Sequence, residues 1–514
     1  MIAAAINLVR FVVGALVASV LYALATPLLY SSGEDVLAFM GWGAVVMVAG
    51  GFLGIYGPGF SLLKRRRAKK AHGSARLARS LDLLGKGVLG GSGLLLGRLG
   101  GQKVRLNAPG HVLTVAPTRT GKGVSAVIPN LLAWPGSVLV FDPKGENAAV
   151  TARRRRELGQ SVHVLDPFGV TGEASAAANP LDAVRVGTPD ALDDARMVAS
   201  MLVVRSGGDD GAHWDDEAEA VLAGLVLWVA DTAPEDARHL GTVRELLTLP
   251  ADAFADLLRR MAEAGGQHAR TAANITGKED RERGNVMSTA KRHTHFLDSE
   301  RLGATLGRSS FAWDGLRDGS LSVFVVLPPD RLSTYRGWVR VLIACALASI
   351  TRHRGQPSHR ALFLLDEFAA LGHMQPILDA VGLVGGYGVH LWLFLQDLTQ
   401  LRRIYGDGAG TFIANAAAVQ AFGTADQETA KLLSDMTGES TTYGRSSDDL
   451  TPGLPGGTLQ TTGRPVLTPD EVRRLGDRHQ LLFLRGQRAA KARKVSYLDD
   501  REFRGLYDPN PMHG

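Results

Sequence analysis

The sequence predicts an α/β protein with a mostly parallel, doubly wound sheet, an all-α insertion domain and an N-terminal hairpin of two transmembrane helices. Three patterns lead to this prediction: two long uncharged apolar segments near the N-terminus, short β-branched runs that alternate with helical patterns further on, and one stretch where only helical patterns occur. The 514 residues are 45% hydrophobic and 21% charged, which excludes a wholly disordered or collagen-like chain. The single cysteine, Cys345, excludes a disulfide framework.

Two apolar segments, residues 11–30 and 37–56, contain no charged side chain. Each is as long as the roughly 20-residue helix that crosses a bilayer. A cleaved signal peptide is the alternative for the first segment, because Arg10 precedes it and residues 23–25 (ALA) have the form of a cleavage site. The second segment would then begin almost at the mature N-terminus, so we expect a membrane-spanning hairpin over residues 1–60.

Basic residues follow this hairpin. The run KRRRAKK (residues 64–70) contrasts with the connection SSGEDV (residues 31–36), which has no Lys or Arg. Because Lys and Arg concentrate on the cytoplasmic side of a membrane, both termini are expected in the cytoplasm. Residues 61–105 carry twelve Lys or Arg against one acid, Asp82, and are predicted to form a basic juxtamembrane stalk. The run can contact anionic headgroups of the lipid bilayer or, alternatively, DNA.

Seven short runs are predicted to be strands, and several are apolar throughout, as is typical of strands covered on both faces. They are HVLTVA (111–116), SVLVFD (137–142), SVHVLD (161–166), SVFVVLP (322–328), ALFLLD (361–366), HLWLFL (390–395) and QLLFL (480–484).

An all-α insertion is predicted over residues 188–302, where apolar residues recur at helical spacing and no strand pattern occurs. Because strand patterns resume afterwards, the insertion interrupts one nucleotide-binding sheet domain, whose two parts are residues 106–187 and 303–514. Residues 438–465, in the second part, are rich in Gly, Ser, Thr and Pro without periodicity, and are predicted to be a long loop.

A glycine-containing turn follows the first predicted strand and precedes a helical pattern. A loop that binds phosphate needs small residues whose backbone N–H groups surround the anion, a lysine that reaches the β- and γ-phosphates, and a helix N-terminus. Gly121 and Lys122 meet these needs, whereas Ala116 and Gly123 replace the first glycine and the usual magnesium-binding hydroxyl residue; a turn that binds nothing is the alternative. The predicted phosphate-binding loop, or P-loop, comprises Pro117, Thr118, Arg119, Thr120, Gly121, Lys122, Gly123 and Val124.

Polar side chains follow two further predicted strands. Asp366 and Glu367 end the run ALFLLDE, and Gln396 follows HLWLFL. Ligands of open α/β sheets bind at the carboxyl ends of the strands. We therefore expect ATP and Mg²⁺ there, with Asp366 as the metal ligand and Glu367 as the residue that orients and deprotonates water. Gln396 suits a sensor of the γ-phosphate, and a capping polar group is its alternative.

The segment DPKGEN (residues 142–147) also follows a predicted strand and offers Asp142, Lys144 and Glu146. It belongs either to the catalytic site or to a turn built by its proline and glycine.

Several motifs in their order along the chain resemble the type IV secretion coupling proteins of the TraG kind. After two membrane spans they are HGSAR (72–76), APTRTGKGV (116–124), SVLVFDPKGEN (137–147), LLDEFAALG (364–372), FLQDLTQL (394–401) and RPVLTPDEV (464–472). The resemblance covers almost the whole chain and implies a P-loop (RecA-like) fold. Glycine commonly follows the P-loop lysine in that family, which accounts for Gly123.

The resemblance also implies a function. Such a protein is an ATPase of the bacterial inner membrane, assembles as a homo-hexamer, recruits a relaxase bound to single-stranded DNA or protein effectors, and delivers them to a type IV secretion channel. By position, Lys122 is the phosphate-binding lysine, Asp366 and Glu367 are the strand-end acids and Gln396 is the sensor. The predicted insertion corresponds to the family's all-α domain, which contributes to substrate recognition.

One position departs from related motors, which often place an arginine eleven residues before the sensor glutamine. That arginine acts on the γ-phosphate in a neighbouring subunit, and here the position is Gly385. Either Arg402, Arg403 or Arg464 substitutes for it, or hydrolysis is slow without a stimulating partner.

Three functions therefore stay open. They are a motor for conjugative DNA transfer, the same ATPase dedicated to protein effectors, and a nucleotide-binding membrane receptor without motor activity, which Gly385 favours. Basic clusters at residues 153–156 and 485–494 are typical of solvated helix faces and strand edges. Any DNA contact is expected to use the phosphate backbone, and so to depend on salt rather than on sequence.

Overall fold

The structure, a computed structural model, describes residues 12–21, 43–50, 71–205, 209–353, 355, 357, 359–445 and 459–512. The chain divides into two compact units. One comprises residues 1–76 and 437–468, and the other comprises residues 77–436 and 469–514.

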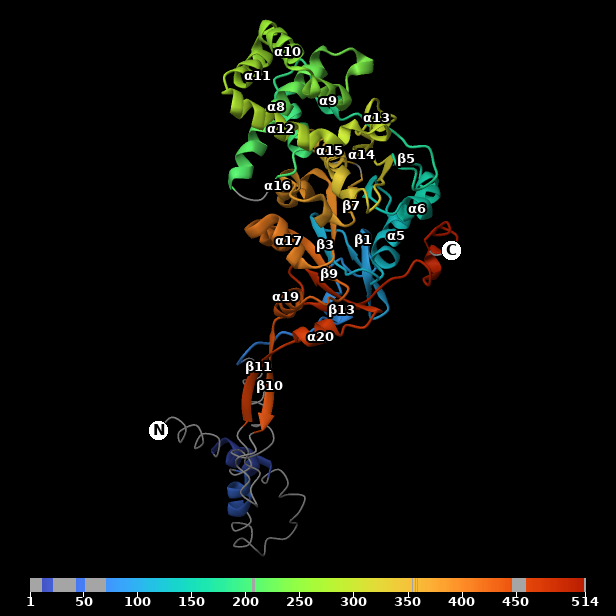
Figure 1. The fold of residues 1–514 in the computed structure, drawn as a ribbon. Helices are drawn as coiled ribbons and strands as arrows, with labels where there is room; N and C mark the ends of the chain where they lie inside the picture. The colour runs from blue at the N-terminus through green and yellow to red at the C-terminus, as the bar shows by residue number, and fades with distance from the viewer. Residues whose placement is uncertain are drawn as a thin grey trace, which may run out of the picture. The chain divides into compact units, whose positions relative to one another are not determined.

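An eleven-stranded sheet forms the centre of the larger unit, in the order β2-β1-β13-β12-β9-β3-β8-β7-β4-β6-β5 (Figure 1). From β9 to β5 neighbouring strands are parallel, and from β9 to β2 they are antiparallel. The strands are β1 (Leu94–Leu99), β2 (Gln102–Leu106), β3 (His111–Val115), β4 (Val138–Phe141), β5 (Ser161–Leu165), β6 (Leu321–Val325), β7 (Ala361–Leu365), β8 (Val389–Leu395), β9 (Ala416–Ala421), β12 (His479–Leu484) and β13 (Ala490–Arg493).

All seven strands predicted from apolar runs lie in this sheet, and the predicted α/β class with a mostly parallel sheet is confirmed. β4 illustrates why. Successive side chains of a strand point to opposite faces, and Val138, Leu139, Val140 and Phe141 are all fully buried. The sheet is therefore covered on both faces, as a doubly wound architecture requires.

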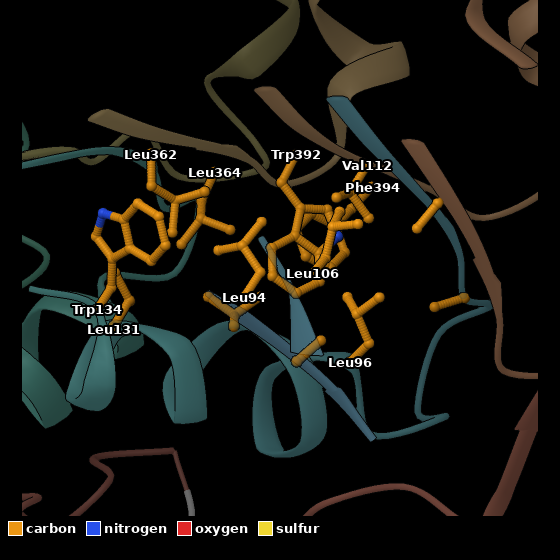
Figure 2. Packing of buried hydrophobic residues seen from close by; sticks show 14 of the residues in the cluster. Leu94, Leu96, Leu106, Val112, Leu131, Trp134, Leu362, Leu364, Trp392 and Phe394 are labelled. Atoms are coloured by element: carbon orange, nitrogen blue, oxygen red, sulfur yellow. The ribbon is translucent and has the colours of Figure 1, made fainter. Parts of the chain in front are cut away.

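Apolar residues at alternate positions of β1, β7 and β8 meet the helix that follows the P-loop, α5 (Ile128–Ala133), on one face of the sheet (Figure 2). The alternation places side chains two residues apart in one layer. Members of this layer are Leu94, Leu96, Leu106, Val112, Leu131, Trp134, Leu362, Leu364, Trp392 and Phe394.

Further helices pack against the sheet. α15 (Leu332–Thr351) contacts β4, and α18 (Ala409–Asn415) contacts β3 and β9. From residue 71 on, the other helices that the structure describes outside the insertion are α4 (Ser80–Leu83), η1 (Gly123–Val127), α6 (Glu146–Glu157), η2 (Pro180–Ala183), α14 (Gly315–Asp318), η5 (Phe368–Leu371), α16 (Gln375–Leu383), η6 (Val384–Tyr387), α17 (Leu398–Tyr405), η7 (Gly406–Gly408), α19 (Gln427–Thr437), α20 (Pro469–Arg473) and η9 (Arg501–Phe503).

The antiparallel end of the sheet corrects one predicted boundary. β1 and all but the last residue of β2 lie within residues 61–105, so the predicted stalk was wrong from residue 94 on. A bulge between Leu95 and Gly97 and the charged residues of β2 interrupt the apolar pattern of this hairpin, which hid it from sequence analysis.

The segment between β5 and β6 is helical, as the sequence predicts, and its helices gather at the top of Figure 1 beyond α15. The last of them continues past the predicted boundary at residue 302. They are α7 (Ala191–Leu202), α8 (Asp209–Thr232), η3 (Glu235–Ala237), α9 (Leu240–Thr248), α10 (Ala251–Ala264), α11 (Gly266–Thr276), α12 (Asp280–Thr294), η4 (His295–Asp298) and α13 (Glu300–Leu306).

The smaller unit contains a second, two-stranded sheet. β10 (Glu439–Arg445) pairs antiparallel with β11 (Leu459–Pro465). The prediction of a loop over residues 438–465 was therefore wrong at both ends, because consecutive threonines in each strand favour extended backbone despite the surrounding glycines. Residues 446–458 lie outside the described residues.

The predicted membrane spans lie largely outside the described residues, and residues 12–21 and 43–50 within them are helical. Among the parts of the chain that the structure describes, no helix is both long enough and apolar enough to cross a membrane.

Candidate nucleotide site

The predicted P-loop connects β3 to η1, a π-helical turn that continues into α5. Such turns are rare and are frequently found at functional sites. Gly121 has a φ of +84°, which glycine adopts freely, whereas Arg119 has a φ of +64°. A non-glycine residue in this region costs about 1–3 kcal/mol. The fold therefore holds the P-loop in a conformation that one of its residues does not favour.

The structure brings together the four residues predicted to act on phosphate. Lys122 Nζ lies 2.6 Å from Asp366 Oδ1 and 2.6 Å from Glu367 Oε1. Gln396 Nε2 donates a hydrogen bond of 3.1 Å to the other carboxylate oxygen of Glu367, Oε2. Glu367 is therefore held from both sides, by a cation and by an amide.

The sheet explains this convergence. β3, β8 and β7 are adjacent and parallel, with Val115 paired to Leu395 and Leu365 paired to Leu393. Their carboxyl ends therefore lie nearly level, and the residue after each strand emerges at one edge. Glu367 itself has a φ of +49°, so the strand-end turn, like the P-loop, is strained.

The pKa values of the two carboxyl groups shift in opposite directions. Burial raises the pKa of Asp366 above its usual range, and Lys122 offsets this only in part. Burial also acts to raise the pKa of Glu367, but Lys122 and then Gln396 outweigh it, so that the pKa of Glu367 is lowered. Glu367 is therefore the carboxylate that stays ionised most readily.

Asp142, one of the alternatives left open, caps a helix. It is 1% exposed, and its carboxylate accepts hydrogen bonds from Asn147 Nδ2 at 3.1 Å and from the backbone N–H of Ala148 at 3.0 Å. Burial raises the pKa of Asp142 to about 7. This geometry supports the turn interpretation. Glu146 of the same segment lies beside the P-loop, because a Cβ atom on Gly123 would be 3.6 Å from Glu146 Oε1.

The C-terminal segment supplies site residues that sequence analysis missed. Lys494 Nζ donates a 2.8 Å hydrogen bond to the carbonyl oxygen of Thr120 and lies 4.3 Å from the ring centroid of Phe422. The backbone N–H of Tyr497 donates to the carbonyl oxygen of Val124 at 3.3 Å. In the sequence Lys494 is one of several basic residues near the C-terminus, so nothing distinguishes it there.

The position of the missing arginine is closed by backbone packing. A Cβ atom on Gly385 would lie 2.8 Å from the backbone nitrogen of Gly110. Arg402 and Arg403 are exposed on α17, and Arg402 Nη1 lies 3.4 Å from Glu428 Oε2. The other predicted substitute, Arg464, belongs to β11 in the smaller unit.

The arrangement fits a nucleoside triphosphate bound with a divalent cation. A strained loop ahead of a helix presents backbone N–H groups, and Lys122 adds a positive charge. Mg²⁺ prefers one or two carboxylates together with phosphate and water oxygens, and Asp366 is suitably placed at the sheet edge. Within the described residues, no group of three or more His, Cys, Asp or Glu side chains forms a metal site.

Comparison with known proteins agrees with this geometry. Residues 78–510 match the family model described as type IV secretory system conjugative DNA transfer. The chain is 33% identical over 401 residues to conjugal transfer protein TraG of Escherichia coli, covering 72% of this chain and 63% of TraG. It is 28% identical over 412 residues to protein VirD4 of Agrobacterium fabrum, covering 77% of this chain and 60% of VirD4. The chain thus spans less than two thirds of the length of these relatives.

Solved structures share the fold. The bacterial conjugative coupling protein TrwBdeltaN70, in an unbound form, superposes with a TM-score of 0.66 at 18% identity, covering 82% of this chain and 92% of TrwB. The plasmid coupling protein TrwB in complex with ADP and Mg²⁺ superposes with a TM-score of 0.65 at 18% identity, covering 82% and 94%. Together, the site and the match over residues 78–510 show that the chain belongs to the type IV secretory system conjugative DNA transfer family.

Proposed function

We propose that this chain is an ATPase of the bacterial inner membrane that recruits a relaxase bound to single-stranded DNA and uses ATP hydrolysis to deliver it to a type IV secretion channel. The observation that carries the ATPase activity is the carboxylate of Glu367, which lies between Lys122 and Gln396. The substrate and the channel are supported by the family and by relatives named as conjugal transfer proteins.

Each residue of the site has one role in this proposal. Lys122 would donate hydrogen bonds to the β- and γ-phosphate oxygens, and Asp366 would hold Mg²⁺, whose charge neutralises the phosphates. Glu367 would accept the proton of the attacking water, and Gln396 would orient that water. Lys122 keeps the pKa of Glu367 low, so the carboxylate becomes a stronger base once the lysine turns towards phosphate.

ATP turnover by the full-length chain in detergent, with and without single-stranded DNA, tests the activity. Lys122→Ala and Glu367→Gln should each lower turnover by about 100-fold or more, since each removes a charge used in the transition state. Lys86→Ala, a change of an exposed lysine outside the site, is the matched control. Wild-type turnover no greater than that of Lys122→Ala, with or without DNA, would contradict the proposal.

The proposal includes a homo-hexamer with a membrane anchor and both termini in the cytoplasm. The structural likeness to TrwB supports the fold of the subunit, and the apolar segments at residues 11–30 and 37–56 support the anchor. A reporter that shows on which side of the membrane it lies should be periplasmic when it is fused within SSGEDV and cytoplasmic when it is fused after Lys70. The opposite pattern would overturn this topology.

Gly385 favours a second candidate, a nucleotide-binding receptor that performs no transport stroke, because its packing against Gly110 leaves no room for an arginine. Nucleotide binding without turnover, even with DNA present, would support it. A chain dedicated to protein effectors would instead show turnover that rises with an effector and not with DNA.

A further inference from the structure

A buried guanidinium links the strand-end turn of the site to the helical insertion. Arg340 of α15 is 1% exposed, and burial lowers its pKa to about 10. Its five N–H groups each find a carbonyl oxygen. Nε donates to Met201 at 2.9 Å, Nη1 donates to Leu371 at 3.1 Å and to His373 at 2.6 Å, and Nη2 donates to Ser200 at 3.4 Å and to Val203 at 3.1 Å.

These five carbonyls belong to two segments. Ser200, Met201 and Val203 form the carboxyl end of α7, where the carbonyl oxygens have no partner within the helix and carry a partial negative charge. Leu371 and His373 end the turn that begins at Glu367. The Arg340 side chain therefore bonds the carbonyl oxygens at the end of α7 in the insertion, and it also bonds those of the turn that carries Glu367.

The path from Glu367 to Arg340 is short and restrained. The carbonyl oxygen of Glu367 accepts from the backbone N–H of Ala370 at 2.8 Å, and Phe368 is fully buried between them. The turn η5 then ends at Leu371, whose carbonyl oxygen meets Arg340. Because Glu367 has a positive φ, its backbone conformation depends on these contacts and on the hold that Lys122 has on its side chain.

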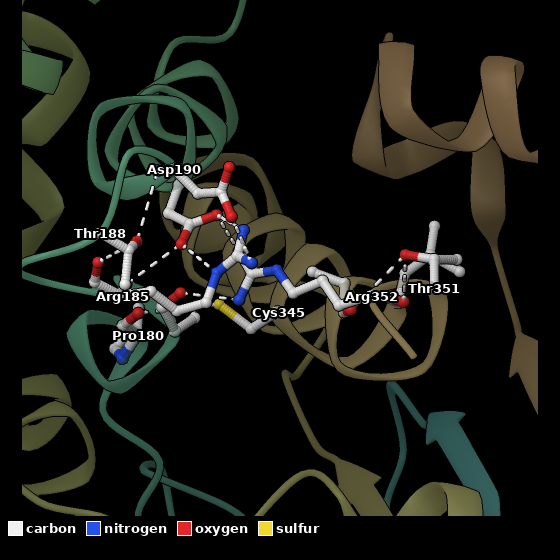
Figure 3. A network of polar contacts seen from close by, with 11 residues as sticks. Pro180, Arg185, Thr188, Asp190, Cys345, Thr351 and Arg352 are labelled. Carbon is white, nitrogen blue, oxygen red and sulfur yellow. Dashed lines mark hydrogen bonds and ion pairs between the residues drawn. The ribbon is translucent and has the colours of Figure 1, made fainter. Parts of the chain in front are cut away.

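A second arginine fixes the other end of the contact between α15 and α7 (Figure 3). Arg352, which follows α15, forms an ion pair with Asp194 of α7 and donates to the carbonyl oxygen of Ala183 at 2.7 Å. Arg185 Nε donates to the same Asp194 at 2.8 Å. With arginines at both ends, α7 is tied to α15 along its length.

α8 follows α7 in the chain and is the longest helix that the structure describes in the insertion. The two helices contact each other, and Arg205 between them donates to Glu219 of α8 at 3.2 Å. A displacement of the end of α7 at Val203 would therefore reach α8.

We propose that Arg340 is a positioning residue that couples the conformation of the Glu367 turn to the α7–α8 corner of the insertion. This inference rests on the proposed function, since it needs a nucleotide that competes for Lys122. The ammonium of Lys122 has three N–H groups, and those spent on phosphate oxygens are withdrawn from Glu367. The turn then loses a restraint, and Arg340 transmits the change. By linkage, a ligand of the insertion alters nucleotide affinity by the same factor.

Hydrogen–deuterium exchange on the full-length chain in detergent, with and without a non-hydrolysable ATP analogue and Mg²⁺, tests the coupling. In the wild type, the analogue should change amide exchange at residues 200–219 by about 5-fold or more, a typical allosteric factor. Arg340→Lys should abolish that change while binding the analogue normally, because lysine cannot bridge both segments. Arg352→Lys, the matched change at the other end of the interface, should keep it.

Two results would overturn the coupling. A wild type that binds the analogue without any change at residues 200–219 overturns the coupling, as does an Arg340→Lys variant that responds like the wild type. If Arg340→Lys does not fold, a wild type that binds the analogue without a change at residues 200–219 still overturns the coupling. A wild type that does not bind the analogue contradicts the proposed function instead.

Discussion

Lys494 donates a hydrogen bond of 2.8 Å to the carbonyl oxygen of Thr120, although the two residues lie 374 positions apart in the chain. The bond holds the P-loop through a backbone carbonyl oxygen and uses none of its N–H groups, which are the groups that would face an anion. The segment that follows β13 is therefore part of the nucleotide site, although it contributes no group to the chemistry.

Lys494→Met should weaken nucleotide binding by about 10-fold, since a hydrogen bond from a charged donor contributes about 1.5–3 kcal/mol and this lysine is only partly buried. Titration of a fluorescent ATP analogue would measure the affinity. Lys491→Met, the same change at an exposed position of β13, should leave it unaltered. Equal affinities of the two variants would show that the bond does not order the loop.

Lys494 should also make the free energy of unfolding depend on pH. Burial lowers the pKa of Lys494 to about 8 from its ordinary value of 10.5. Between these values the unfolded chain binds more protons than the folded chain, so the free energy of unfolding should rise with pH across the window from about 8 to 10.5. Unfolding midpoints at several pH values would show this slope, and Lys494→Met should reduce it. If Lys494→Met has the same slope as the wild type, other titratable groups cause the pH dependence.

Gln396→Glu should be more harmful than Gln396→Ala. Alanine removes the amide that bonds Glu367 at 3.1 Å, whereas glutamate adds a third carboxylate to the site, beside those of Asp366 and Glu367. We expect turnover to fall about 10-fold with alanine and about 100-fold with glutamate. Like charges also raise the pKa of one carboxyl group, so the remaining activity of Gln396→Glu should require higher pH. ATP turnover against pH measures both effects, and equal losses in the two variants would contradict the prediction.

Gly385→Ala should destabilise the protein by about 1–3 kcal/mol, because its Cβ would lie 2.8 Å from the backbone nitrogen of Gly110. Gly386→Ala is the control, since a Cβ at that position would have no atom within 4 Å apart from its own neighbours in the chain. Thermal unfolding compares the two. If both variants unfold at the wild-type temperature, the backbone there can move, and an arginine could be accommodated after all.

Asp142→Asn should be tolerated better than Asp142→Ala. Asn147 Oδ1 is buried without a partner and can accept from the new amide, whereas alanine leaves the start of α6 uncapped.

The pKa of Asp142 is raised to about 7 from 3.8, so the stability from this carboxyl group is complete below about 3.8 and is lost as the pH rises through about 7. The neutral amide should remove this loss. Unfolding temperatures at pH 5 and 8 test it, and an Asn variant that keeps the wild-type difference would contradict it.

The central strands could be predicted because they are buried on both faces and therefore read as unbroken apolar runs. β9 (AAAVQA) is equally buried, but alanines gave no strand signal. The hairpin β1–β2 contains glycine and charged residues and was assigned to the stalk. Edge and alanine-rich strands depend on partners distant in sequence, which a local pattern does not contain.

The site was predictable to the extent that its residues follow strands. Lys122, Asp366, Glu367 and Gln396 converge because the three strands before them are neighbours. Arg155, in contrast, was read as part of a solvated basic face, yet it is fully buried and donates to the carbonyl oxygen of Leu131 at 3.0 Å. Four consecutive arginines on a helix must point in different directions, and the sequence does not say which one faces the sheet.

The span of the contacts at the P-loop sets an order of events during synthesis. Lys122 bonds a carboxylate that lies 245 positions later in the chain, and Thr120 accepts a hydrogen bond from a lysine 374 positions later. At a translation rate of about 5–20 residues per second, these two partners are made tens of seconds after the P-loop. Until then the P-loop lacks both contacts. A ribosome-bound chain thus lacks the complete set of contacts around its nucleotide site until residue 494 has been made.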